Sequence, residues 1–445
     1  MPGWYRAARH AVGRRTRSPG PATGPAPARY DARAMTSRPA PGPLAGILVA
    51  DCSTVLAGPY ATMLLADLGA DVVKVEPPEG DATRGWGPPW VGAGAARTAA
   101  YYLAVNRNKR SLRLDVRTEG GRDVLRRLLA RADVLVENHR VGGFARLGFD
   151  DATLEALNPR LVHLAITGYG PTGPEAATPG YDFIVQALAG VMSITGFPDA
   201  AGGEPTKVGV AISDLTTGML GAVAVLAALG GRDRPGSPAH GRGQRIDVSL
   251  LESTLAWLAN QAQGYFATGV APARLGNAHP SIVPYETFAT ADGAIAVAVG
   301  SERQWPRFAE AIGSPELTDD LRFRTNGDRV VHRDALRRLV AARLATEPSA
   351  AWLARLGAAE VPAGPINDLA AAFAAPQVAA RGLVVDVEHP VLGPVRQVGP
   401  PFALHATPAT VRTAPPLLGE QSAEILAELG LSPAEIAGLR EAGTI

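Results

Sequence analysis

Two aspartates stand where the chain turns into a helix. Asp182 follows a Gly/Pro-rich stretch, and Asp214 separates a short strand-like segment from an apolar helical pattern. An unperturbed aspartate has a pKa of about 3.9 and is an anion at neutral pH. A helix N-terminus stabilises and orients such an anion, which can then attack an activated acyl group. Helix N-capping is the alternative role for either side chain.

Basic side chains near predicted strand ends suggest a ligand with several phosphates, because arginine forks match phosphate oxygens. These residues are Lys74, Lys109, Arg110, Arg117, Arg140 and Arg146. Any one of them could equally be a solvated surface charge.

Other chemistries find little support in the sequence. The segment GYGPTG at residues 168–173 fits a dinucleotide-binding motif, but Pro171, Pro174 and Pro179 prevent the helix that this motif requires. We interpret it as a turn. The eight histidines lack zinc-ligand spacing, so no metal is expected. The single cysteine, Cys52, lies in an apolar run and is predicted to be buried; a reactive thiol is the alternative.

Strand and helix patterns alternate along the first half of the chain. Strands are predicted at residues 44–51, 71–76, 132–137 and 161–167, and helices at 60–68, 120–131 and 215–229. This alternation predicts an α/β fold with a parallel sheet covered by helices. Residues 246–257 lead into a long helix. A strand at 294–299 and helices at 302–312 and 333–344 indicate a smaller second lobe, and two short helices close the chain within 417–443.

Length and composition fit a two-domain globular protein, with 46% hydrophobic and 19% charged residues in 445. Residues 1–43 carry eight arginines and one aspartate, so the rest of the chain is net acidic, which disfavours nucleic-acid binding. We expect these 43 residues to be disordered. They resemble a transit peptide, or the first 34 of them are an extension before a true start at Met35. No apolar run is long enough to span a membrane, and we expect a cytoplasmic enzyme.

Many short motifs in order resemble the family III CoA-transferases, the CaiB/BaiF family, which is related to the α-methylacyl-CoA racemases. They include LAGPY at 56–60, ADLGADVVKVE at 66–76, NRNKRS at 106–111, ENHR at 137–140, GYD at 180–182, SD at 213–214, RLGN at 274–277 and APPLLGE at 414–420. The resemblance covers essentially the whole chain after residue 42.

The resemblance implies a Rossmann-like large domain from both chain ends, an inserted smaller α+β domain and an interlocked homodimer. In this chain the expected parts are 44–245, a linker helix and small domain at 246–370, and a return to the large domain at 371–445. No tightly bound cofactor is implied; acyl-CoA and a carboxylic acid are the substrates. By similarity, Asp214 is the nucleophile, which forms an anhydride and then an aspartyl-CoA thioester, and Tyr181 and Asp182 lie near the reacting centre. The residues implied to line the CoA and active site are Val55, Trp86, Leu114, Arg117, Asn138, Arg140 and Arg146.

Two departures from the formyl-CoA transferases put formate and oxalate in doubt as substrates. Leu56 replaces a glutamine, and GNAHP at 276–280 replaces a glycine-run loop. We expect a larger or more apolar acyl group. Two other functions stay open: α-proton transfer by a racemase, in which Tyr181 would stand in place of the expected histidine, and acyl-CoA binding without catalysis.

Overall fold

The computed structural model describes residues 42–445. The predictions made for residues 1–41 (disorder, a transit peptide, or an extension before Met35) lie outside the described residues. The predicted domain boundaries stay predictions, although the elements on either side of them can be compared one by one.

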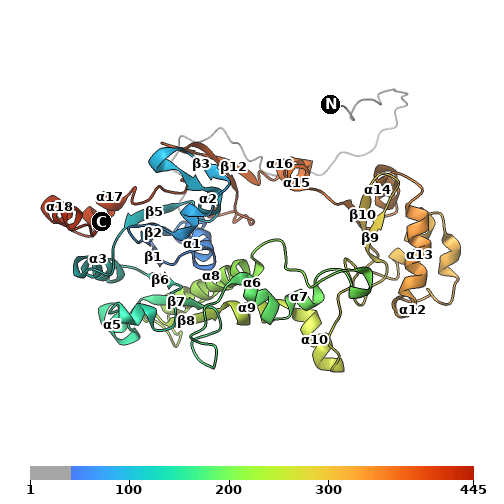
Figure 1. The fold of residues 1–445 in the computed structure, drawn as a ribbon, viewed down its shortest axis with the longest axis horizontal. Helices are drawn as coiled ribbons and strands as arrows, with labels where there is room; N and C mark the ends of the chain where they lie inside the picture. Colours follow the sequence, from blue (N-terminus) through green and yellow to red (C-terminus); the bar gives the residue numbers. More distant parts are fainter. Residues whose placement is uncertain (1–41) are drawn as a thin grey trace, which may run out of the picture. The chain divides into compact units, whose positions relative to one another are not determined.

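A six-stranded parallel sheet forms the centre of the Rossmann-like part of the chain (Figure 1). Its order is β5 (Lys109–Arg113), β2 (Asp71–Glu76), β1 (Leu48–Cys52), β6 (Val134–Glu137), β7 (Val162–Thr167) and β8 (Arg245–Ser249). The chain therefore places β2 and β5 on one side of β1, and then β6, β7 and β8 on the other side. The crevice outside the carboxyl ends of β1 and β6 is the switch point, where ligands of such sheets bind.

Two apolar layers cover the faces of this sheet. On one face, α3 (Glu119–Leu129), α5 (Asp151–Leu157), α17 (Ser422–Glu428) and α18 (Pro433–Glu441) contribute to a core that includes Leu125 and Leu426. On the other face, α1 (Ala57–Asp67), α6 (Asp182–Leu188), α8 (Ile212–Asp233) and α9 (Leu250–Trp257) contribute Leu65, Val185, Val225 and Leu250. The last two helices thus pack on the sheet that the first half of the chain builds, as predicted.

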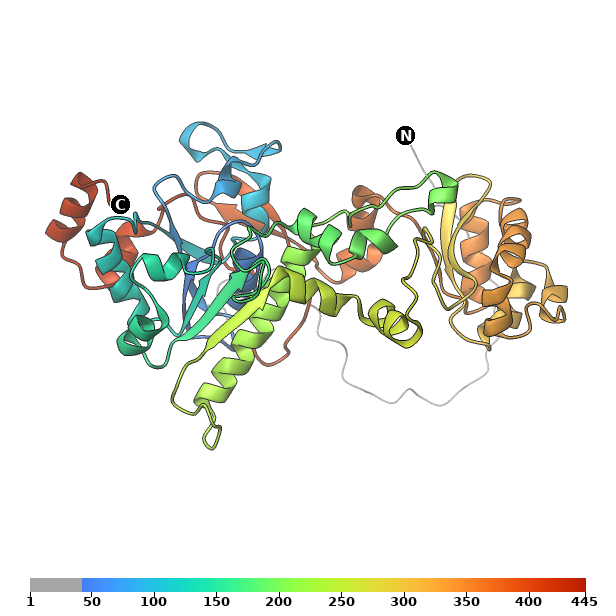
Figure 2. The ribbon, with the colours of Figure 1, turned by 60° about the horizontal axis from the view of Figure 1, so that its bottom comes forward.

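Two glycines let helix α8 pack closely on its neighbours, Gly218 against α1 and Gly221 against β7. A Cβ at Gly218 would lie 2.6 Å from the Ala57 carbonyl oxygen, and one at Gly221 would lie 2.9 Å from Leu164. Figure 2 shows α8 running beside β7 and β8. The helix spans 22 residues and is long and apolar enough to cross a membrane, but half of its most apolar stretch is buried within the chain. The expectation of a shorter apolar segment was wrong because residues 212–214 and 230–233 extend the helix.

A separate apolar core lies between residues 283 and 361. The antiparallel strands β9 (Tyr285–Ala289), β10 (Ala294–Ala298) and β11 (Ala363–Pro365) pack with α11 (Gln304–Ala311), α13 (Arg333–Leu344) and α14 (Ser349–Ala358) around Phe308 and Trp352. A hairpin of β12 (Val384–His389) and β13 (Gly393–Val398) packs against Tyr102 and Leu103.

Most predicted elements match observed ones, but the first strand, predicted at residues 44–51, is observed at Leu48–Cys52, and several observed elements were not predicted. Residues 71–76 form a strand as predicted, and the strands at 132–137 and 161–167 are shortened by one or two residues. Strand β5 and the β12–β13 hairpin were not predicted. Residues 246–249, expected to lead into a helix, instead belong to the edge strand β8, because Val248 and its neighbours pair with β7.

Candidate active site

The ends of β1 and β6 are joined at the switch point by one amide side chain. Asn138 Oδ1 accepts the backbone N–H of Thr54 at 2.9 Å, and Asn138 Nδ2 donates to the Thr54 carbonyl oxygen at 2.7 Å. The sequence prediction placed Asn138 and Val55 in the CoA site, and the structure brings them together. Both ends of the Asn138 amide bond to Thr54, which indicates a role in shaping the turn.

Val55 follows in the left-handed region, with φ of +70°, a conformation that costs a residue with a branched side chain about 1–3 kcal/mol. The backbone N–H of Val55 donates to the Asp81 carboxylate at 3.2 Å, which compensates part of this cost. The turn delivers the chain into α1, whose N-cap residue Leu56 has no polar side-chain atom to satisfy the first N–H groups. Such a helix start, at the carboxyl edge of a parallel sheet, suits an anionic ligand.

Asp214 lies in the first turn of α8, next to this turn. An apolar cluster that contains Val55, Leu56, Tyr101, Ala211 and Leu215 lines the contact between the two segments. Burial, and then the negative charge of Asp182, raise the pKa of Asp214 to about 7. Among the residues that the structure describes, no cation is near enough to oppose this shift.

Asp182 begins α6 and is held by two donors. Its Oδ1 accepts the backbone N–H of Ser213 at 2.8 Å, and its Oδ2 accepts the Gln186 side-chain amide at 2.8 Å. The predicted alternative of local N-capping was therefore wrong in detail for both aspartates. Asp214 lies inside its helix, after the N-cap residue Ala211, and Asp182 caps α8 rather than its own helix. The two carboxylates meet because one of them satisfies the helix that carries the other.

Tyr101 lies near enough to this carboxylate pair to be affected by both charges, and Trp86 contacts Tyr101. Tyr101 and Trp86 pack edge to face with ring centroids 5.3 Å apart. Burial, followed by the charges of Asp214, Asp182 and Asp81, raises the pKa of Tyr101 to about 12, so its phenol keeps its proton. Trp86 was predicted from the resemblance. Tyr101 was missed, because nothing in the local pattern distinguishes it from the buried Tyr102.

The remaining predicted residues are not all at the site. Tyr181 is 65% exposed, so its ring does not contact the pair as a buried partner would. Leu114 is buried in the core under α3. Arg117 is exposed beyond the edge strand β5 and pairs with Asp115 and Glu79. Arg140 and Arg146 are exposed in the segment that follows β6, where α4 (Gly143–Arg146) places the Arg146 guanidinium over Gly142.

Three of the basic residues suggested as phosphate ligands serve the fold instead. Lys74 and Lys109 are buried under the β1 turn and pair with Asp81 at 2.9 Å and Asp51 at 3.0 Å. Arg110 pairs with Asp71 and with two glutamates of α17. The suggestion was wrong because the sequence pattern does not distinguish a charge that is paired inside the protein from one left for a ligand.

Two other predictions concern sites that do not form. Residues 168–181 contain no helix, as expected of a turn, so GYGPTG is not a dinucleotide cradle. Cys52 is buried, and burial together with the charge of Asp51 raises the pKa of its thiol far above the ordinary value, as expected of an inert cysteine.

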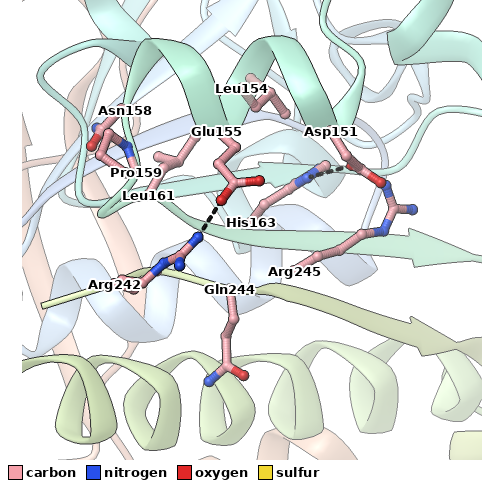
Figure 3. Close-up of a pocket in the computed structure, with 11 residues that line it drawn as sticks. Asp151, Leu154, Glu155, Asn158, Pro159, Leu161, His163, Arg242, Gln244 and Arg245 are labelled. Atoms are coloured by element: carbon pink, nitrogen blue, oxygen red, sulfur yellow. Dashed lines mark hydrogen bonds and ion pairs between the residues drawn. The ribbon is translucent and has the colours of Figure 1, made fainter. Parts of the chain in front are cut away.

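A cavity of about 220 Å³ lies at the opposite, amino-terminal ends of β7 and β8 (Figure 3). Its charged side chains pair with one another: Arg242 with Glu155, and Arg245 with Asp151 at 2.7 Å. None of the predicted site residues lines it. This cavity is therefore separate from the predicted site at the carboxyl edge of the sheet.

Known proteins resemble this chain over most of its length. Residues 44–422 match the family model of CoA-transferase family III. Succinate–glutarate CoA-transferase of Agrobacterium fabrum is 45% identical over 390 residues, which are 87% of this chain and 96% of that protein. Human succinyl-CoA:glutarate CoA-transferase is 39% identical over 388 residues, 87% of this chain and 86% of that protein. Acetyl-CoA:oxalate CoA-transferase of Acetobacter aceti is 42% identical over 346 residues, 77% and 86% of the two chains.

Solved structures agree. A CaiB/BaiF family protein from Brucella suis superposes with a TM-score of 0.77 at 43% identity, covering 87% of this chain and 100% of that one. The fold class and the enzyme class inferred from the sequence are thereby confirmed, as is acyl-CoA as a substrate. The names of these relatives also favour the transferase over the racemase and the non-catalytic binder. The chain is a member of CoA-transferase family III, an enzyme that transfers CoA between an acyl-CoA and a carboxylic acid.

Proposed function

We propose that Asp214 is the nucleophile that carries CoA from the donor to the acceptor. The observation that supports this role is its surroundings: a carboxylate in the first turn of a helix, beside a second carboxylate, with a pKa raised to about 7 by burial and by Asp182. A carboxylate of raised basicity is a stronger nucleophile than an ordinary one while still partly ionised at neutral pH.

The transfer proceeds by exchange of acyl groups on the Asp214 carboxyl. An Asp214 oxygen attacks the donor thioester carbonyl, the C–S bond breaks, and a mixed anhydride and CoA thiolate form. The thiolate attacks Cγ of Asp214, giving an aspartyl-CoA thioester and the free donor acid. The acceptor carboxylate then attacks this Cγ and expels the thiolate, which adds to the acceptor carbonyl and restores the Asp214 carboxylate. No proton is gained or lost in total.

Asp182 contributes to the first step through its charge. Two donors, the Ser213 N–H and the Gln186 amide, hold the Asp182 carboxylate in place. Acylation of Asp214 removes one of the two adjacent negative charges, so the repulsion present in the free enzyme is relieved as the anhydride forms. Tyr101 keeps its proton and can therefore donate a hydrogen bond near the two carboxylates.

The CoA moiety is proposed to lie at the switch point, across the β1 turn and the segment after β6. The start of α1 supplies backbone N–H groups, Asn138 fixes the turn at Thr54, and Arg140 and Arg146 supply positive charge for phosphates. Leu114 and Arg117 are left out of this proposal, because the first is buried in the core and the second is paired at the far edge strand.

We propose a dicarboxylic donor and acceptor, with succinyl-CoA and glutarate as the first pair to test. The proposal rests on the names of relatives at 39–45% identity, which transfer CoA between succinate and glutarate. It keeps the expected larger acyl group but not the more apolar one. Oxalate is the alternative acceptor, since a relative at 42% identity is named for it.

The test is a transfer assay with separation of the CoA esters. Wild-type enzyme with succinyl-CoA and glutarate should form glutaryl-CoA, at least about tenfold faster than it forms oxalyl-CoA from oxalate. Asp214→Asn should form neither product. Asp368→Asn, which alters an aspartate that caps an exposed helix, α15 (Leu369–Ala374), is the matched control and should keep full activity. Equal rates for wild type and Asp214→Asn would overturn the proposal.

We also propose that the enzyme is a cytoplasmic homodimer in which a second copy covers an apolar surface on helices α6, α8, α9 and α10 (Ala259–Thr268). The exposed large side chains there are Phe183, Ile184, Leu188, Met219, Leu220, Val223, Leu226, Leu255, Trp257, Tyr265 and Phe266. Exposed apolar surface of this extent favours a partner. Light scattering after gel filtration should give twice the chain mass, and Val223→Glu should reduce it; a wild-type monomer would contradict the dimer.

A further inference from the structure

Gln186 is a fully buried amide next to the carboxylate pair. It occupies the fifth position of α6, one helical turn after Asp182, and its side chain has no exposed surface. A buried amide that lacks partners costs about 1–3 kcal/mol, so its hydrogen bonds define its role.

The two ends of the Gln186 amide are distinguished by their partners. Its oxygen accepts the backbone N–H of Val208 at 2.9 Å, and its nitrogen donates to Asp182 Oδ2 at 2.8 Å. The Val208 partner can only donate, so it requires the amide oxygen and leaves the NH₂ group for the carboxylate. The orientation of the amide is thereby fixed.

Asp182 transmits this arrangement to the start of α8. Its second oxygen accepts the N–H of Ser213, the residue before Asp214. The N-cap residue of α8 is Ala211, whose methyl group cannot accept a hydrogen bond, so Asp182 supplies the cap from another helix. Gln186 therefore connects α6, the segment at 208 and the first turn of α8.

We propose that Gln186 is a positioning residue for CoA transfer, which holds the Asp182 carboxylate as an acceptor against α8 and so fixes its place beside Asp214. This inference rests on the proposed role of Asp214. An apolar residue of similar length, such as methionine, cannot replace Gln186, because it has no N–H group to donate to Asp182. A carboxylate cannot replace it either, because it places a third negative charge in the group.

Other titratable groups on neighbouring elements do not duplicate this role. Tyr101 of α2 (Ala100–Ala104) stays protonated, Asp81 pairs with Lys74, and Glu252 of α9 accepts the Ser249 hydroxyl at 2.6 Å. Lys207 is exposed and donates to the Val208 carbonyl at 3.2 Å. The donor to Asp182 Oδ2 is the Gln186 amide.

The test compares Gln186→Met and Gln186→Glu across pH 5 to 9, with the proposed donor and acceptor. Both variants should lower kcat by about tenfold or more, with KM for acyl-CoA within about twofold of wild type. The acid limb of kcat should move in opposite directions. It should shift to lower pH in Gln186→Met, where the Asp182 carboxylate is no longer held in place beside Asp214, and to higher pH in Gln186→Glu, where negative charge is added.

Two controls separate this role from a structural one. Gln397→Glu introduces a carboxylate at a buried glutamine of β13, away from the pair, and should leave the limb in place. In an Asp182→Asn background, Gln186→Met should no longer move the limb. An unmoved limb in both single variants would overturn the inference even if their activity fell. A wild-type enzyme without transfer activity would instead overturn the proposed function, so the two failures are distinguishable.

Discussion

Two groups of carboxylates near the carboxyl edge of the sheet differ in what surrounds them. Asp51 and Asp81 lie under the β1 turn, fully or almost fully buried, and each pairs with a lysine. Asp182 and Asp214 lie at the starts of α6 and α8, less buried, and next to each other. Burial alone does not distinguish a reactive carboxylate from a structural one; the sign of the neighbouring charge does.

The effect on the pKa is opposite for Asp51 and Asp214. For Asp51, burial raises the pKa, but Lys109, Lys74 and hydrogen bonds from Ser53 and Thr62 outweigh it and lower the pKa to about 2. For Asp214, burial and the Asp182 charge act in the same direction and give about 7. The paired group stabilises the β1 turn as permanent ions, and the unpaired group retains a carboxyl that can react.

The largest expected effect is on activity. Asp214→Asn should reduce CoA transfer by roughly a thousandfold or more, because the covalent route is lost. Its free energy of unfolding should equal or exceed that of wild type, since one of two adjacent charges is removed. Transfer assays and urea unfolding of the same preparations check both. A variant that is inactive and also strongly destabilised would instead place Asp214 among the structural residues.

Under the β1 turn, by contrast, loss of a charged partner is expected to lower the stability of the protein. Lys74→Met leaves Asp81 buried without its cation and should lower the free energy of unfolding by roughly 3–5 kcal/mol. Urea unfolding measures this loss. Arg396→Met, which removes an exposed pair with Asp386, is the control and should cost about 1 kcal/mol or less. If Lys74→Met lost no more stability than the control, the structural role assigned to the lysine-paired carboxylates would be contradicted.

The pH dependence of stability should have opposite signs for the contributions of Asp214 and Asp51. The folded-state pKa of Asp214 lies above the unfolded value near 3.9, so its contribution is present below pH 4 and is lost as the pH rises through 7. Asp214→Asn should therefore gain roughly 1–2 kcal/mol relative to wild type between pH 4 and 8. The pKa of Asp51 is lowered, so its contribution is present above pH 4 and is lost as the pH falls toward 2.

Urea unfolding of wild type, Asp214→Asn and Asp51→Asn at several pH values gives both slopes. Asp51→Asn should lose its disadvantage as the medium becomes acidic. Parallel curves for the two variants would mean that the charge environments of the two aspartates do not differ in the way described.

The smallest effect is expected where the ligand phosphates are proposed to bind. Arg140→Met should raise KM for acyl-CoA by about fivefold to tenfold with kcat nearly unchanged, because an exposed charge contributes about 1 kcal/mol. Arg117→Met, at the far edge strand, is the matched control and should leave KM unchanged. Equal effects of the two substitutions would return Arg117 to the CoA site.

Four of the six strands of the sheet could be predicted from the sequence, and the roles of Asp182 and Asp214 stay predictions. Period and turn signals locate β2, β6 and β7 because each is a short apolar run bounded by polar residues. They miss β5, since its sequence KRSLR has the composition of a surface segment although Lys109 is buried. Strand β8 was missed for a related reason: as an edge strand it is only half-buried, so its apolar pattern runs on into α9.

The contacts between side chains distant in sequence could not be predicted in the same way. Nothing local shows that Asp182 caps α8, that Gln186 holds Asp182, or that Asn138 spans from β6 to Thr54. These contacts depend on the packing of whole elements. The same limit explains why Lys74 and Lys109 were taken as candidate ligand residues: their partners, Asp81 and Asp51, are 7 and 58 residues away.

The most direct test of the central claim is to trap the acyl group on the unpaired carboxylate. Wild-type enzyme is incubated with succinyl-CoA, treated with hydroxylamine or borohydride, digested and mapped by mass spectrometry. The account predicts a modification at Asp214 that is absent in Asp214→Asn and absent at Asp51 and Asp81 in every sample. An active enzyme whose modification maps to another residue, or that is modified equally in Asp214→Asn, would contradict it.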